Sequence, residues 1–133
     1  MDDGDVGKWV ATLDIAKKLG ARIVCTGHGP RSSGTVLDDQ QAFFKALREQ
    51  VGVLMAKQAP EEAKAQIESV RAALKGNPQV ARYVGERGTK EDSFPAQVGK
   101  VYEELTGKKL ASLIHEPLLA RHVHARSHGL ASA

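Results

Sequence analysis

The sequence predicts a mostly helical protein with one short β-strand, and two patterns indicate that fold class. Apolar residues recur at steps of three and four over most of the chain, which places them on one face of an α-helix. One short run is β-branched, Ile23 and Val24, and it stops at Gly27 as a strand that ends in a turn does. Proline and glycine residues separate the helical segments from one another.

The composition is that of an ordinary globular domain. The 133 residues are 41% apolar and 26% charged, which is enough for one domain with a buried core. The net charge of +3 is spread along the chain, and only three Phe, two Tyr and one Trp are present for base stacking. Both facts argue against nucleic-acid binding. No apolar run approaches the roughly 18 residues of a membrane span.

The start of the sequence and its single cysteine favour a cytoplasmic protein. The first five residues are Met-Asp-Asp-Gly-Asp, which is too acidic for a signal peptide. Cys25 has no second cysteine with which to form an internal disulfide, and it fits a reducing compartment. Because Cys25 falls on the predicted strand, we expect a buried, inert thiol.

The N-terminal third is predicted to be a helix over residues 5–19 that leads into a strand over residues 22–26. Trp9 and Leu13 belong to the apolar stripe of the helix, and Gly20 ends it. Residues 31–34 are predicted to be a polar loop. Since no second strand is predicted, the backbone groups of the strand need a partner. We therefore expect a homo-oligomer, or pairing with a missing N-terminal half.

The chain beyond this loop is predicted to be helical up to residue 119. The expected helices cover residues 35–58, 60–74, 93–107 and 110–119, with a short helical turn at residues 80–84. Thr35 and Asp38 resemble a capping box at the start of the first of them. Trp9 and Tyr102 are expected in the core, and the pair Glu103–Glu104 on a solvated face.

The strongest motif is the turn Gly-His-Gly-Pro at residues 27–30. It follows an Asp-Gly-Asp loop, the helix with Trp9 and Leu13, a Leu-Gly-Ala link and the strand, and a Leu-Asp-x-Gln helix comes after it. In this order the segments resemble the C-terminal third of a metallo-β-lactamase-fold hydrolase, over roughly residues 3–55. The resemblance implies a C-terminal fragment of an αββα fold plus a helical extension. It also implies that His28 is a zinc ligand.

The same resemblance implies a zinc-dependent hydrolase, but only one of its ligands is present. The main metal motif of the family, His-x-His-x-Asp-His, does not occur in these 133 residues. A catalytic zinc site takes three protein ligands and an open position for water. We therefore expect the chain by itself to bind no stoichiometric zinc and to be inactive, with no catalytic residue assigned. The substrate is not predicted, because the fold hosts lactam, thioester and phosphodiester hydrolysis.

The resemblance divides the chain into a helix–strand–turn unit of a metallo-β-lactamase-like domain (residues 1–34), a helical extension (35–119) and a flexible histidine-rich tail (120–133). A second candidate metal site lies in this tail, at His122, His124 and His128. His-x-His on a strand puts both rings on one side, and His124 and His128 share a helix face. Two alternatives to the hydrolase fragment therefore stand. One is an oligomeric helical interaction module without catalysis, and the other is a metal-binding domain that uses the tail.

Overall fold

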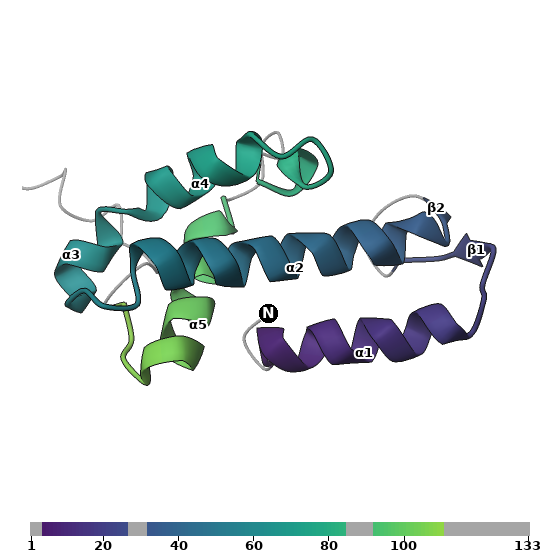
Figure 1. Ribbon diagram of the computed structural model, residues 1–133, viewed down its shortest axis with the longest axis horizontal. Coiled ribbons are helices and arrows are strands. Elements are labelled where there is room, and N and C mark those ends of the chain that lie inside the picture. Colours follow the sequence, from purple (N-terminus) through teal and green to yellow (C-terminus); the bar gives the residue numbers. More distant parts are fainter. Residues whose placement is uncertain (1–3, 27–31, 85–91, 111–133) are drawn as a thin grey trace, which may run out of the picture.

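The computed structural model describes residues 4–26, 32–84 and 92–110, and these residues form a helical body with one small sheet (Figure 1). The long helix α2 (Thr35–Leu54) runs through the middle. Three helices pack against it: α1 (Val6–Lys18), α4 (Ile67–Lys75) and α5 (Phe94–Thr106). The predicted fold class is thus confirmed in its helical part. No helix in the described ranges is long and apolar enough to cross a membrane.

One hydrophobic core joins α1, α2, α4 and α5. Its fully buried side chains come mainly from the facing stripes of these helices: Val6, Leu47, Val51, Met55, Val70, Leu74, Val98, Val101 and Tyr102. Each such aliphatic side chain stabilises the fold by roughly 1.5–3 kcal/mol relative to an exposed one. Tyr102 is buried as expected, and its hydroxyl donates a hydrogen bond to the Gln58 carbonyl at 2.7 Å.

Helix α1 begins and ends where the sequence predicts. The Asp5 side chain caps it by accepting a hydrogen bond from the Lys8 N–H at 2.8 Å, and Gly20 follows it with φ +63°. The expected core position of Trp9 is wrong, because 44% of that residue is exposed. The inner face of α1 is centred on Val6 and Leu13, with Val10 packed partly against the core, and Trp9 lies at the border of this face.

The strand has a partner within the chain. β1 (Ile23–Val24) pairs antiparallel with β2 (Ser32–Ser33), with Ile23 opposite Ser33 and Val24 opposite Ser32. The predictions of a single strand over residues 22–26 and of a loop over residues 31–34 are therefore wrong. Backbone groups make the ladder, so two serines can pair although their side chains carry no strand signal.

Helix α2 starts without the predicted capping box. Its N-cap is Gly34, no side chain caps it, and the Thr35 hydroxyl instead lies 2.6 Å from that of Ser33. A Cβ at Gly34 would lie 2.5 Å from the Ala21 carbonyl oxygen. Glycine is needed here because the link after α1 passes directly over the start of α2.

The C-terminal half contains shorter helices than predicted. The expected helix over residues 60–74 is split into α3 (Pro60–Lys64) and α4, while the predicted turn appears as the 3₁₀ helix η1 (Ala81–Tyr83). Helix α5 ends at Gly107 with φ +70°, as predicted. Glu104 on this helix is not on a solvated face: its side chain is only 12% exposed, because it pairs with Arg48.

Candidate functional site

The predicted metal ligands lie outside the described residues. His28 falls in the segment 27–31, and His122, His124 and His128 fall in the segment 111–133. Their roles therefore stay predictions. Within residues 4–26, 32–84 and 92–110, no group of three or more His, Cys, Asp or Glu side chains is arranged to hold a metal ion.

The structure does describe the base from which the His28 segment departs. Because Val24 is paired with Ser32, the chain leaves β1 and returns to β2 at the same place, next to the start of α2. Ala21, in the link between α1 and β1, also lies close to Gly34 at the start of α2. Both ends of the segment with the Gly-His-Gly-Pro motif are thus held at one end of the α1–α2 pair (Figure 1).

A buried amide fixes α1 against α2 beside this base. Gln41 of α2 is 5% exposed, and its Nε2 donates to the Val10 carbonyl at 3.0 Å and to Asp14 Oδ1 at 2.6 Å. Its Oε1 accepts a hydrogen bond from Lys17 Nζ at 3.1 Å. Lys17 also forms an ion pair with Asp38 at 2.8 Å. Every polar atom of the buried amide therefore has a partner on α1.

These contacts shift the pKa values of two side chains on α1, Asp14 and Lys17. The hydrogen bond from Gln41 is the main reason why the pKa of Asp14 lies below its usual value. The hydrogen bond to Asp38 likewise raises the pKa of Lys17. Both shifts favour the charged forms, so the link between α1 and α2 stays ionised at neutral pH.

Cys25 lies just beyond β1 and is exposed, so the expectation of a buried thiol is wrong. The strand ends at Val24, one residue earlier than a pairing of Cys25 would require. Without that pairing and without a covering layer, nothing in the described part of the chain buries the side chain.

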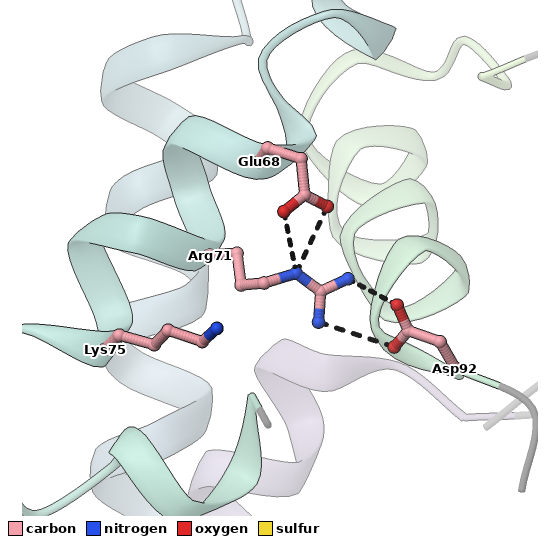
Figure 2. A pocket seen from close by; sticks show the side chains of 4 residues that line it. All are labelled: Glu68, Arg71, Lys75 and Asp92. Atoms are coloured by element: carbon pink, nitrogen blue, oxygen red, sulfur yellow. Dashed lines mark hydrogen bonds and ion pairs between the residues drawn. The ribbon is translucent and has the colours of Figure 1, made fainter. Parts of the chain in front are cut away.

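A second polar cluster lies on the other side of α2, around Arg71 of α4 (Figure 2). The Arg71 side chain is 9% exposed, and its Nε donates to both oxygens of Glu68 at 3.1 Å. Nη1 donates to the Val84 carbonyl at 2.9 Å, and the guanidinium forms a two-pronged ion pair with Asp92. The same group lies 4.5 Å from the centre of the Phe94 ring.

This arrangement controls the charge of Asp92. Burial by itself would raise the pKa of Asp92, but hydrogen bonds from Arg71 and from the Phe94 N–H outweigh it and lower the pKa. For Arg71, burial acts to lower the pKa, and the two carboxylates outweigh it. Both pKa shifts favour the charged forms, so the pair of Arg71 and Asp92 stays ionised at neutral pH.

An open hollow is lined by Glu68, Arg71, Lys75 and Asp92. Its two carboxylates are already bound to Arg71, which also holds Val84 and Asp92 together. This arrangement supports a structural role: one guanidinium binds both Val84, just after η1, and Asp92, just before α5, and so holds these two parts of the chain together. The sequence did not predict the role of Arg71, because a basic residue on a helix is expected to be exposed to solvent when its partners are unknown.

Apolar side chains are also exposed on the side of α1 that faces away from α2. Ile15 is 65% exposed, Leu19 at the C-cap is 80% exposed, and Ile23 of β1 is 60% exposed. We call these three residues the outward row. Ile15 and Leu19 lie on the side of the helix opposite to the buried Val6 and Leu13.

Comparison of the chain with models of protein families, with curated proteins and with solved structures finds no match.

Proposed function

We propose that this chain is the C-terminal part of a zinc-dependent hydrolase of the metallo-β-lactamase fold, to which it contributes His28 as one metal ligand. The remaining ligands would come from another polypeptide segment. Support comes from the order of α1, β1 and the Gly-His-Gly-Pro motif, and from the base formed by Val24 and Ser32, which holds both ends of that segment.

The single observation that carries this proposal is that the outward row is exposed although α1 already packs on α2 through its opposite side. One face packs on α2, and the outward row leaves Ile15, Leu19 and Ile23 between 60% and 80% exposed. Large exposed apolar side chains that gather on one side often mark a surface that another protein layer covers. Another protein layer over α1 and β1 would supply that burial, and in the proposed enzyme this layer carries the rest of the metal site.

The described residues do not form a zinc site by themselves. Catalytic zinc is held by three protein ligands, and no such set occurs in the described ranges. When bound in a complete site, zinc would acidify a water molecule and polarise the scissile bond. What this chain contributes is position: Gln41 fixes α1, and the hairpin base fixes the point at which the His28 segment leaves the body.

The test compares the 133-residue chain with the protein encoded by the reading frame extended upstream of Met1. We expect an in-frame His-x-His-x-Asp-His motif upstream, bound zinc in the extended protein, and loss of that zinc in its His28→Ala variant. The purified 133-residue chain should contain far less than one zinc per molecule by elemental analysis.

The matched control is the triple substitution of His122, His124 and His128 by Ala in the extended protein. We expect this variant to keep its zinc, because the proposed site uses His28 alone from this chain. The proposal is wrong if no such motif lies upstream, or if zinc follows the tail histidines and not His28.

A further inference from the structure

We draw no further inference here: the strongest candidate, the exposed apolar patch that the outward row forms on α1 and β1, already belongs to the proposed function, and nothing in the structure shows what covers it.

Discussion

Arg48 and Glu104 are 56 residues apart in the sequence, and their side chains meet at 2.8 Å between α2 and α5. The second carboxylate oxygen of Glu104 accepts a hydrogen bond from the Val6 N–H at 2.7 Å. A negative charge at a helix N-terminus is favourable, because the first N–H groups of the helix lack partners within it. One carboxylate thus joins the start of α1 to α2 and α5.

Replacing Glu104 by Ala should lower the free energy of unfolding by about 2–3 kcal/mol, since two charge-assisted hydrogen bonds are lost and Arg48 keeps an unpaired charge. Urea denaturation measures the change. Glu103→Ala is the matched control: Glu103 is the neighbouring residue and is 39% exposed, and its only described ion pair is a 3.9 Å contact with Lys109. A change within about 0.5 kcal/mol is expected for it. Equal effects of the two substitutions would contradict the assigned role of Glu104.

Arg71→Met should also destabilise the fold. It keeps most of the aliphatic stem but removes every donor to Glu68, Val84 and Asp92. Because Asp92 is partly exposed and can regain water, we expect a loss of about 2–3 kcal/mol. Arg71→Lys should rescue little, since an ammonium cannot reproduce the two-pronged contact.

The control for Arg71 is Lys75→Met, because Lys75 lines the same hollow and forms no ion pair with a described residue. Thermal unfolding followed by circular dichroism compares the variants. A Tm for Arg71→Met that equals that of Lys75→Met would show that the contacts of Arg71 add nothing to stability.

Stability should fall in acid through Asp92 and Asp14. Both have a folded-state pKa below the ordinary value of 3.8, so the folded chain holds these carboxylates ionised more strongly than the unfolded chain. Their contribution is fully present above the unfolded value and is lost as the pH falls from about 3.8 through the folded-state pKa. Urea midpoints measured downward from neutral pH should show the loss. Asp92→Asn should flatten this pH dependence, and an unchanged profile would contradict the role of Asp92.

Gly34→Ala should destabilise the junction between β1 and α2. The added Cβ would lie 2.5 Å from the backbone oxygen of Ala21, and a backbone atom moves only with the chain around it, so we expect a cost of about 1–3 kcal/mol. Gly52→Ala is the matched control inside α2. A Cβ there has nothing within 4 Å, and alanine should stabilise the helix by about 0.5–1 kcal/mol. Chemical denaturation of both variants should give opposite signs.

The helices could be predicted because their signals are local. The apolar period and the glycines at 20 and 107 mark α1 and α5 without any knowledge of their neighbours. The strand partner could not be predicted in the same way, because Ser32 and Ser33 pair through the backbone alone. The prediction that Trp9 lies in the core was wrong for a related reason. An apolar stripe predicts that one face of a helix is buried, but the helix that packs on it decides which residues of the stripe are covered.

The polar links required information that no local pattern contains. Arg71 meets Asp92 across 21 residues and Arg48 meets Glu104 across 56, so neither pair follows from helical spacing. Of the predicted metal site, only the base of the His28 segment lies in the described residues. The role of His28 stays a prediction, because residues 27–31 lie outside the described part of the chain.

The amide of Gln41 has a consequence for how α1 finds its place on α2. It bridges a cation and an anion on successive turns, Lys17 and Asp14, while its donor also reaches the Val10 carbonyl. A displacement of α1 would separate Gln41 from Asp14 and Lys17, and the buried amide would lose hydrogen bonds that are costly to leave unmade. Contacts between apolar side chains are non-directional and change little in free energy when a helix shifts slightly. A buried hydrogen-bonding group is directional and loses its partners. The hydrogen bonds of Gln41 therefore favour the observed alignment of α1 on α2 over shifted ones.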